Sequence, residues 1–231
     1  MSDIAGASVL VAGASGGLGA PLTRQLAAAG ALLTITSRDG ARLSDLGVDG
    51  VCVPADLRRA GVADTVVERA VGAHGRLDGI VFAAGAVAFG PAAETPDDIL
   101  ISLFTLNTLG PIRLLRAARP HLQASAASGR APFVVHISAV VAETPMPGMA
   151  AYSASKAALA AFDTAAAREL RRDRIRLVDA RPPHTETGLA DRPLHGSTPR
   201  LPTGLDPEAV AARILLAIEN DETDLPSSAF T

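Results

Sequence analysis

The fold is decided by the stretch Ser8-Val-Leu-Val-Ala12, which is followed by Gly13-Ala-Ser-Gly-Gly17-Leu-Gly19 and by Ala20–Ala29. The first segment is a continuous run of small and aliphatic residues that ends at a glycine, which is typical of a buried strand. In the last segment leucines recur every four residues, and Gly30 marks the expected end of a helix. The chain therefore enters a glycine-rich turn from a strand and leaves it as a helix.

The glycines of this turn each meet a different requirement. Gly13 permits a sharp turn out of the strand, Gly17 lets backbone amides approach a diphosphate, and Gly19 lets the helix pack closely on the sheet. The helix N-terminus offers free N–H groups and a partial positive charge to phosphates. The spacing G-x-x-x-G-x-G alone fits a plain turn equally well, but its place between the first strand and the first helix favours a nucleotide site. The turn residues expected to bind a cofactor are Gly13, Ser15, Gly16, Gly17, Leu18 and Gly19.

Length and composition limit the class of protein. A chain of 231 residues with 48% hydrophobic residues fits one α/β domain, so residues 1–231 are expected to form a single domain. The net charge of −3 and the lack of a basic run argue against nucleic acid or a membrane surface as a partner. Cys52 is the only cysteine, and the histidines and acids show no metal-ligand spacing, so no disulfide and no metal are expected. The N-terminus has no secretory signal pattern and no segment has the length of a membrane span, which predicts a cytoplasmic protein.

Predicted strands and helices alternate along the chain. The strands are expected at 8–12, 31–36, 50–53, 78–83, 132–138 and 175–180. The helices are expected at 18–29, 61–73, 97–119, 152–171 and 207–219. This alternation predicts a doubly wound (Rossmann) α/β fold, with a parallel sheet of about seven strands and helices on both faces. The small-residue stretches 124–131 and 185–205 are expected to be surface loops.

The end of the second predicted strand bears on the choice of cofactor. A fold that binds NAD usually places an acid about 20 residues past the glycines, where it holds the ribose hydroxyls. Ser37 and Arg38 stand at that place in this chain. A hydroxyl and a guanidinium suit a 2′-phosphate, so NADP(H) is favoured over NAD(H). The neutral Gly16 is one point against this preference.

Two further strand ends are expected beside the cofactor. Asp56 follows the third strand, and its carboxylate either accepts a hydrogen bond from an adenine amino group, with Leu57 packed on the ring, or serves as an N-cap or turn residue. The fourth strand ends in small residues, which let a cofactor lie flat on the strand tip. These residues are Ala83, Ala84 and Gly85.

Taken together, these features resemble the short-chain dehydrogenase/reductase family over nearly the full length of the chain. The resemblance rests on the order of the motifs Gly13-x-x-x-Gly17-x-Gly19, Asp56, Phe82-Ala-Ala-Gly85, Asn107 and Tyr152-x-x-x-Lys156. It implies an NAD(P)-dependent oxidoreductase that interconverts a small-molecule carbonyl and an alcohol. It also implies a homodimer or homotetramer formed through helices 97–119 and 152–171.

Tyr152 and Lys156 are the residues expected to carry the chemistry. They lie four residues apart near the start of a predicted helix, so the phenol and the ammonium project from one face. Because a nearby cation favours phenolate, Lys156 is expected to lower the pKa of Tyr152. Tyr152 then acts as a general acid/base while hydride moves to or from the nicotinamide. The resemblance adds that Lys156 holds the nicotinamide ribose.

Asn107 and Ser138 are further candidates for the catalytic site. Asn107 is a poor helix former within a helical pattern, and the resemblance implies that it bends the helix and holds a water that links the lysine to solvent. A surface or capping amide is the alternative. The family has a serine thirteen residues before the tyrosine, where this chain has Ala139. Ser138 takes that role only if a bulge turns it; otherwise the hydroxyl is lost, and a backbone amide or Thr144 replaces part of its contribution.

The residues after the last predicted strand have the position of the family's cofactor loop. Pro182, Thr185 and Thr187 are expected to contact the cofactor. Pro183 departs from the family pattern, where a glycine is usual, and stiffens this turn. His184 is expected to be a loop histidine without a chemical role.

The proline-rich residues 188–205 resemble the family's substrate lid. Arg192, His195 and Arg200 in this segment suggest an anionic or strongly polar substrate. His136 is expected to be a buried strand residue.

The sequence thus predicts an NADP(H)-dependent carbonyl/alcohol oxidoreductase. Two alternatives stay open. One is a cofactor-binding regulatory or scaffold protein with little turnover, which Ala139 and Pro183 favour. The other is a non-redox isomerase or dehydratase on the same scaffold.

Overall fold

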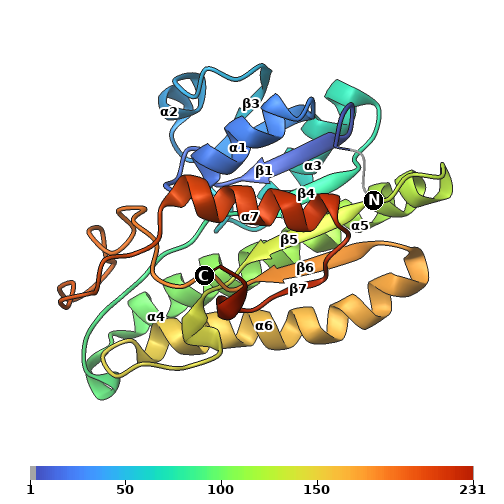
Figure 1. The fold of residues 1–231 in the computed structure, drawn as a ribbon. Helices are drawn as coiled ribbons and strands as arrows, with labels where there is room; N and C mark the ends of the chain where they lie inside the picture. The colour runs from blue at the N-terminus through green and yellow to red at the C-terminus, as the bar shows by residue number, and fades with distance from the viewer. Residues whose placement is uncertain (1–3, 231) are drawn as a thin grey trace.

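The computed structural model describes residues 4–230, and its strands form a seven-stranded sheet in the order β3-β2-β1-β4-β5-β6-β7 (Figure 1). The strands are β1 (Ser8–Ala12), β2 (Leu32–Ser37), β3 (Gly50–Pro54), β4 (Gly79–Phe82), β5 (Phe133–Ile137), β6 (Arg176–Ala180) and β7 (Asp224–Leu225). All neighbouring strands are parallel. The predicted doubly wound α/β sheet is therefore confirmed.

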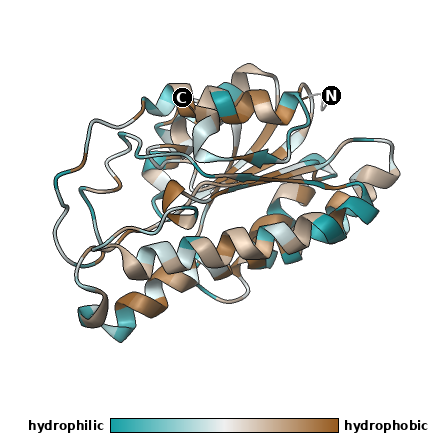
Figure 2. Ribbon diagram, turned by 60° about the horizontal axis from the view of Figure 1, so that its bottom comes forward, coloured by the Kyte–Doolittle hydropathy of each residue, from teal (hydrophilic) through white to brown (hydrophobic). Residues whose placement is uncertain are grey.

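Helices cover both faces of the sheet (Figure 1). They are α1 (Gly19–Ala28), α2 (Gly40–Ser44), α3 (Val62–His74), α4 (Asp97–Phe104), α5 (Gly110–Ala127), α6 (Ala150–Leu170) and α7 (Pro207–Glu219). Helices α1 and α7 share a core cluster with one face, and helices α3, α5 and α6 share a second cluster with the other face. Figure 2 shows hydrophobic residues running through the sheet between the two helix layers.

The strands are apolar throughout because both of their faces are covered. In β1, Val9 and Val11 join the cluster under α1 and α7, whereas Leu10 and Ala12 join the cluster on the side of α3, α5 and α6. All four side chains are fully buried. Burial of a valine or leucine side chain stabilises the fold by about 1.5–3 kcal/mol, so the first strand anchors both layers.

The helix predicted over 97–119 is longer than expected and is interrupted. Residues Thr105–Leu109 form a π-helical turn between α4 and α5. Helix α5 continues through Pro120 to Ala127, so the loop predicted from residue 124 begins later. Pro120 removes only one helical hydrogen bond, and the helix stays in place because one side is buried against the sheet. The buried side includes Leu114, Leu115, Ala118 and Leu122.

The helical stretch Asp97–Ala127 has the length and composition of a membrane span. The expectation that no segment reaches this length is therefore wrong. The stretch includes α5, whose buried side covers the sheet. Two short elements, α2 and β7, were also missed, because five and two residues are too few for a periodic pattern.

The predicted site residues gather at one edge of the sheet because the strands are parallel. The carboxyl ends of the strands lead into the glycine turn after β1, Asp56 after β3, Ala83 after β4, Ser138 after β5 and Pro182 after β6. The chain moves outward from β1 in one direction and returns through β4 in the other. Ligands of open α/β sheets bind at such a switch point.

Candidate active site

Tyr152 and Lys156 lie on α6, and they are the only tyrosine and the only lysine of the chain. Their exposed fractions are 8% and 4%. Lys156 Nζ donates a hydrogen bond to the backbone carbonyl of Ile137 at 2.8 Å. A Cβ atom built on Gly85 would lie 3.7 Å from this nitrogen and 3.6 Å from Asn107 Oδ1. The ammonium therefore reaches the space between the ends of β4 and β5, beside Asn107.

Asn107 lies in the π-helical turn, where the sequence pattern suggested a bend. Its Oδ1 accepts a hydrogen bond from Ala86 N at 2.9 Å. Its Nδ2 donates to Ala86 O at 2.9 Å and to Ser155 Oγ at 3.0 Å. These bonds tie the segment after β4 to α6, so the side chain is an internal link between elements. Its part in a water relay stays a prediction.

The expectation that Lys156 lowers the pKa of Tyr152 is wrong for this structure. Burial raises the pKa of the Tyr152 phenol to about 12. The Lys156 ammonium is directed at the Ile137 carbonyl, and burial lowers its pKa to about 8 although Asp179 and Asp163 oppose this change. At neutral pH both side chains therefore keep their protons.

Ser138 is buried, and its Oγ donates to the backbone carbonyl of Lys156 at 3.3 Å. Its backbone N–H donates to Ala180 O at 2.8 Å, which continues the pairing of β5 with β6. The bulge that would turn this hydroxyl is therefore not found at Ser138. The next residue, Ala139, is extended with φ −171° and carries no hydroxyl. Ser138 thus faces the helix that bears Tyr152 and Lys156.

The glycine turn has the close contacts that the sequence predicts. Gly13 has φ +82°, and a Cβ atom there would lie 2.5 Å from Ala84 N. A Cβ atom on Gly19 would overlap the carbonyl oxygen of Gly13. A Cβ atom on Gly17 would lie 2.5 Å from Thr187 Cβ, so the Thr187 segment lies directly on the turn. Helix α1 has neither a side-chain cap nor an acid in its first turn, which leaves its N-terminal amides suited to an anion.

Two serines and two arginines surround the outer end of this turn. Ser15 Oγ donates to Ser37 Oγ at 2.9 Å, and Ser37 Oγ donates to Asp39 O at 3.0 Å. Arg38 is exposed beside them. Arg42 donates to Ser15 O at 3.2 Å and was missed by the sequence reasoning. The available signal was its position four residues after Arg38, although α2 was not predicted.

Two acids near this end already have partners. Asp39 caps α2 by accepting hydrogen bonds from Ala41 N and Arg42 N at 3.0 and 3.2 Å. Asp56 forms an ion pair with Arg58 at 2.7 Å and accepts the N–H of the same residue. The hydrogen bond from the Arg58 side chain holds the pKa of Asp56 below its ordinary value. These bonds agree with the interpretation of Asp56 as a turn residue rather than as an acceptor for the adenine amino group.

Small residues expose the backbone at the end of β4. Ala83 N donates to Ala12 O at 2.8 Å, and Ala84 lies against Gly13. Gly85 borders the Lys156 ammonium and the Asn107 amide. By contrast, the side chain of Leu57 is buried in the core, so little of it can face a ligand.

The segment after β6 folds back toward the glycine turn. Val140 N donates to Pro182 O at 3.0 Å, and Thr187 N donates to Thr185 O at 2.7 Å. Thr185 Oγ1 donates to Pro183 O at 2.9 Å, so Pro183 fits a turn that a threonine closes. The His184 ring lies 3.6 Å from the carboxylate of Glu186, which belongs to the same segment.

The predicted lid lies over the residues that follow β4. Leu194 N donates to Val87 O at 2.8 Å, and Phe89 N donates to His195 O at 3.0 Å. Arg192 donates to the carbonyls of Gly188 and Thr187, so its charge faces the cofactor loop. Apolar lid residues pack on the cluster that contains Tyr152; these are Leu189, Ala190 and Leu201.

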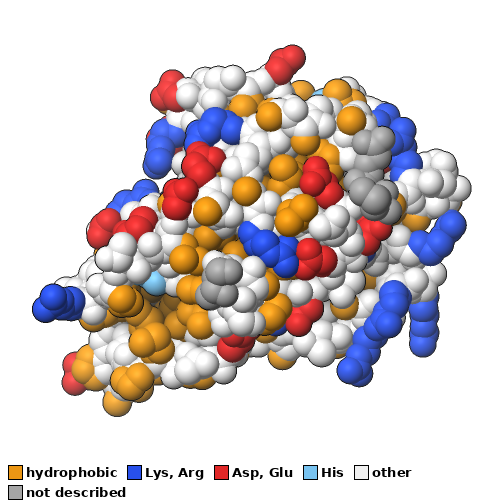
Figure 3. All heavy atoms as spheres, viewed as in Figure 1, with side chains coloured by type: hydrophobic (Ala, Val, Ile, Leu, Met, Phe, Trp, Pro, Cys, Tyr) orange, Lys and Arg blue, Asp and Glu red, His pale blue; other side chains and the backbone are white. Residues whose placement is uncertain are grey.

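The surface near the lid is apolar. Figure 3 shows hydrophobic side chains over α4 and the neighbouring loops, at the lower left of the view. The exposed large ones include Ile101, Met146 and Leu194. The lid residues that pack around Tyr152 are therefore apolar. They do not support the expectation of an anionic substrate.

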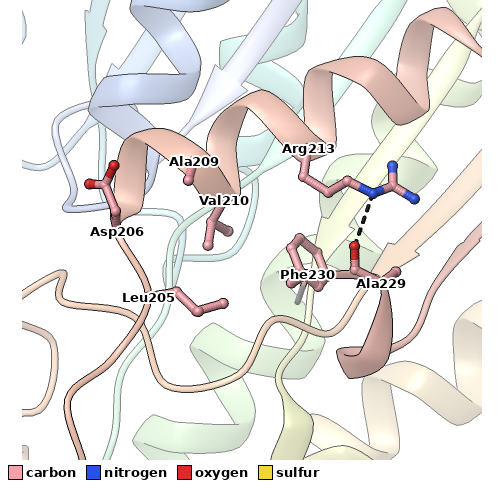
Figure 4. A pocket seen from close by; sticks show the side chains of 7 residues that line it. All are labelled: Leu205, Asp206, Ala209, Val210, Arg213, Ala229 and Phe230. Atoms are coloured by element: carbon pink, nitrogen blue, oxygen red, sulfur yellow. Dashed lines mark hydrogen bonds between the residues drawn. The ribbon is translucent and has the colours of Figure 1, made fainter.

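Two surface depressions flank the site, and Tyr152 lines neither of them. One of about 320 Å³ lies beside the glycine turn and is lined in part by Ser15, Gly17, Arg24, Arg42, Thr187 and Arg192. The other, of about 240 Å³, lies between α7 and the C-terminal residues (Figure 4). There Phe230 lies beside Val210, and Arg213 Nε donates to Ala229 O at 3.0 Å. The first depression combines arginines with the open backbone amides of the glycine turn, which suits phosphates, whereas Arg213 in the second is paired with Glu222.

The donor set at the glycine turn fits a dinucleotide. The open amides of α1 suit a diphosphate, and the serines and arginines at the outer end suit a phosphorylated ribose. Lys156 and the end of β4 lie at the opposite side of the switch point. Thr187 lies against Gly17, where a threonine side chain can reach a diphosphate bound at the turn.

The parallel sheet, the glycine turn at its switch point and the Tyr152–Lys156 pair define a doubly wound α/β protein of the Rossmann class. A family model described as short chain dehydrogenase matches residues 7–195. The chain therefore belongs to the short-chain dehydrogenase/reductase family of oxidoreductases, as the sequence motifs suggested.

Individual relatives agree with this membership. An uncharacterized oxidoreductase from Methylorubrum extorquens is 34% identical over 185 residues, which cover 77% of this chain and 72% of the relative. A short chain dehydrogenase from Burkholderia cenocepacia in complex with NADP is 25% identical, with a TM-score of 0.82 over 98% of this chain and 89% of that one. The solved structure of a short chain dehydrogenase/reductase from Burkholderia phymatum in complex with NAD is 20% identical, with a TM-score of 0.88 over 98% of this chain and 90% of that one, and shows the same fold. The solved relatives thus hold either cofactor.

Proposed function

We propose that the protein is an NADP(H)-dependent oxidoreductase that interconverts a carbonyl and an alcohol, with Tyr152 as the general acid/base. One observation carries this proposal. The only tyrosine and the only lysine of the chain are both buried on α6, one helical turn apart, at the sheet edge that also holds the glycine turn. Burial of a charged ammonium is costly unless the group is paired and hydrogen-bonded, so a buried lysine beside a ligand-binding edge is a candidate functional residue.

When bound, the dinucleotide supplies or accepts the hydride at the substrate carbon. The proton is handled by the protein. Because burial keeps the pKa of Tyr152 near 12, its phenol is protonated at neutral pH and can donate to the oxygen of a carbonyl during reduction. Lys156 keeps the proposed role of holding the nicotinamide ribose. In alcohol oxidation Tyr152 accepts the proton instead.

The substrate oxygen is held without the usual serine hydroxyl in this proposal. Ser138 donates to the Lys156 carbonyl, and position 139 is alanine. Ser138 therefore positions α6 rather than the substrate. Asn107, which links α6 to the end of β4, keeps the proposed role of anchoring a water beside Lys156.

The preference for NADP(H) is supported by the outer end of the glycine turn. Arg38 and Arg42 supply positive charge, and Ser15 and Ser37 supply hydroxyls. The acids nearby cap α2 or pair with an arginine, so neither is directed at a ribose hydroxyl. A 2′-phosphate matches this donor set.

The test is a panel of ketones and aldehydes with NADPH, followed by the loss of NADPH absorbance. We expect turnover of at least one carbonyl compound, and a fall of about 10²-fold or more in Tyr152→Phe. The variant still binds NADPH in a fluorescence titration, because the phenol oxygen alone is removed. Turnover that survives Tyr152→Phe contradicts the assigned role.

A second candidate is a cofactor-binding protein with little turnover. It is favoured by the missing hydroxyl at Ala139 and by the burial of the Ser138 hydroxyl. NADPH binding without turnover of any carbonyl or alcohol in the panel would support it. Co-purified cofactor that is never consumed would instead support an isomerase or dehydratase.

We further propose a cytoplasmic homodimer or homotetramer that is a single domain with a lid over residues 188–205. The basis for the oligomer is the family resemblance of the helices within 97–119 and 152–171. Light scattering at several protein concentrations tests the subunit count, and a monomer at all of them would contradict it.

A further inference from the structure

Three buried titratable side chains lie behind Lys156 and take no part in the mechanism above. They are His136 on β5, Asp163 on α6 and Asp179 on β6, with exposed fractions of 0%, 1% and 6%. His136 and Asp179 are register partners on neighbouring strands, so their side chains lie on the same face of the sheet. Asp163 stands seven residues after Lys156, two helical turns along the same side of α6. The three residues therefore form one cluster between the sheet and the helix of the proposed catalytic pair.

A short hydrogen bond orders this cluster. His136 Nδ1 lies 2.7 Å from Asp163 Oδ1, so the imidazole ring and the carboxyl group share one hydrogen bond. Asp179 Oδ2 accepts from Arg181 Nη1 at 2.5 Å. The remaining atoms Asp163 Oδ2, Asp179 Oδ1 and His136 Nε2 are buried without a hydrogen-bond partner. One oxygen of each carboxylate is thus left inside the molecule unpaired.

This arrangement is unfavourable as a purely structural device. A buried polar atom without a partner destabilises the fold, and apolar residues of similar volume often replace buried charges without loss of stability. The two acids therefore lie at a place where stability alone does not require them, which points to a function in the neighbouring site.

The charged groups named near Lys156 lie on α6 and on the two strands beneath it, β5 and β6. Asp163 lies on α6 itself, His136 on β5 and Asp179 on β6. Beyond Asp179, Arg181 also binds Glu143 at 2.6 Å and Asp224 at 2.5 Å. Its charge is therefore shared by three carboxylates.

Lys156 is the cation on which both buried acids act. Its ammonium is bonded to the carbonyl of Ile137, the residue that follows His136 in β5. Burial lowers the pKa of Lys156, and the charges of Asp179 and Asp163 oppose that change. The pKa of Asp179 is itself raised to about 6, first by burial and then by Asp163. The ionisations of Lys156 and Asp179 are thus linked.

We propose that Asp163 and Asp179 are positioning residues for the reaction: their carboxylates form a buried counter-charge that keeps Lys156 in its ammonium form, and His136 orients Asp163. The benefit to catalysis rests on the proposed function of Lys156. The electrostatic link between the three residues exists with or without turnover.

The chain allows a direct measurement, because Lys156 is its only lysine. Protein labelled with ¹³C,¹⁵N-lysine gives a single side-chain NMR signal, and its pH titration reports Lys156 in the free protein. The test variants are Asp163→Asn and Asp179→Asn. The control is Asp78→Asn, which removes a carboxylate that is also buried but accepts from Ser125 Oγ and Ser8 N at the opposite edge of the sheet.

We expect the titration midpoint of Lys156 to fall by about one pH unit or more in each test variant, and to stay unchanged in Asp78→Asn. An unchanged midpoint in the test variants, or an equal fall in the control, overturns the proposal. If Asp163→Asn does not fold, the titration of Lys156 in Asp179→Asn is sufficient to test the proposal. The readout needs neither cofactor nor substrate, so its failure is distinct from failure of the proposed function.

A pH profile then tests the link to catalysis. Loss of the counter-charge moves the alkaline limb of the reduction rate to lower pH by the same shift that NMR measures. A residue that only stabilises the fold would lower the rate equally at all pH values, and that result would overturn the positioning role.

Discussion

The ionisation of Tyr152 can be followed by itself, because the chain has no other tyrosine and no tryptophan. The perturbation is a rise in pH from neutrality to about 12 in the free protein. Burial raises the pKa of this phenol from 10.0 to about 12. At about pH 11 an ordinary tyrosine is roughly 90% ionised, whereas Tyr152 is expected to be roughly 10% ionised. The structure therefore predicts a roughly ninefold smaller tyrosinate signal than an exposed tyrosine gives.

The assay is the near-ultraviolet absorbance of tyrosinate, with circular dichroism recorded on the same samples to show that the fold is intact. The reference is the wild-type protein in denaturant, and the blank is Tyr152→Phe. A midpoint near the ordinary tyrosine value in folded protein would refute the reasoning. It would mean that the phenol is exposed or that Lys156 lowers its pKa, as the sequence pattern suggested.

The raised pKa of Tyr152 makes the free energy of unfolding depend on pH. The folded protein holds the phenolic proton more tightly than the unfolded chain, so the contribution of Tyr152 to stability is complete below about pH 10 and is lost as the pH rises through 12. A rise of two pKa units contributes about 2.7 kcal/mol to the free energy of unfolding, and about 1.4 kcal/mol of this is lost at about pH 11. Denaturant unfolding at about pH 9 and 11 should show that loss in the wild type but not in Tyr152→Phe.

Two further predictions concern the cofactor end of the site. Arg38→Asp should weaken NADPH binding by at least about tenfold relative to NADH, whereas the exposed Arg69→Ala on α3 should leave the ratio unchanged; equal affinities in both variants would defeat the assignment. Gly17→Ala should abolish NADPH binding because the new methyl group overlaps Thr187, and Gly72→Ala is its matched control. Gly72 lies in a helix with open space around it, so alanine there should raise the free energy of unfolding by about 0.5–1 kcal/mol without loss of binding.

The fold was predictable where the chain pattern is long and repeated. Six of the seven strands lie within two residues of their predicted bounds, because continuous apolar runs ended by glycines mark strands covered on both faces. Helix α7 begins and ends as predicted, since Asp206 caps it and Pro207 opens it. The end of α5 was missed, because Pro120 argues for a helix end locally while burial of one helix side against the sheet decides otherwise.

The site was predictable in its members but not in its electrostatics. The motif placed Tyr152 and Lys156 on one face of a helix, and the structure agrees. Their ionisation depends on burial and on residues from β5 and β6, which no local spacing reveals. Likewise, the direction of the Ser138 hydroxyl depends on the pairing of β5 with β6, so sequence alone left both alternatives open.

One continuous segment joins the two halves of this site. Thr187 lies on Gly17 of the glycine turn, and Leu189, two residues further, packs on the cluster that contains Tyr152. The backbone of the same segment then pairs with residues that follow β4, through Val87. The residues that contact the glycine turn and the residues that cover Tyr152 therefore belong to one short, continuous segment.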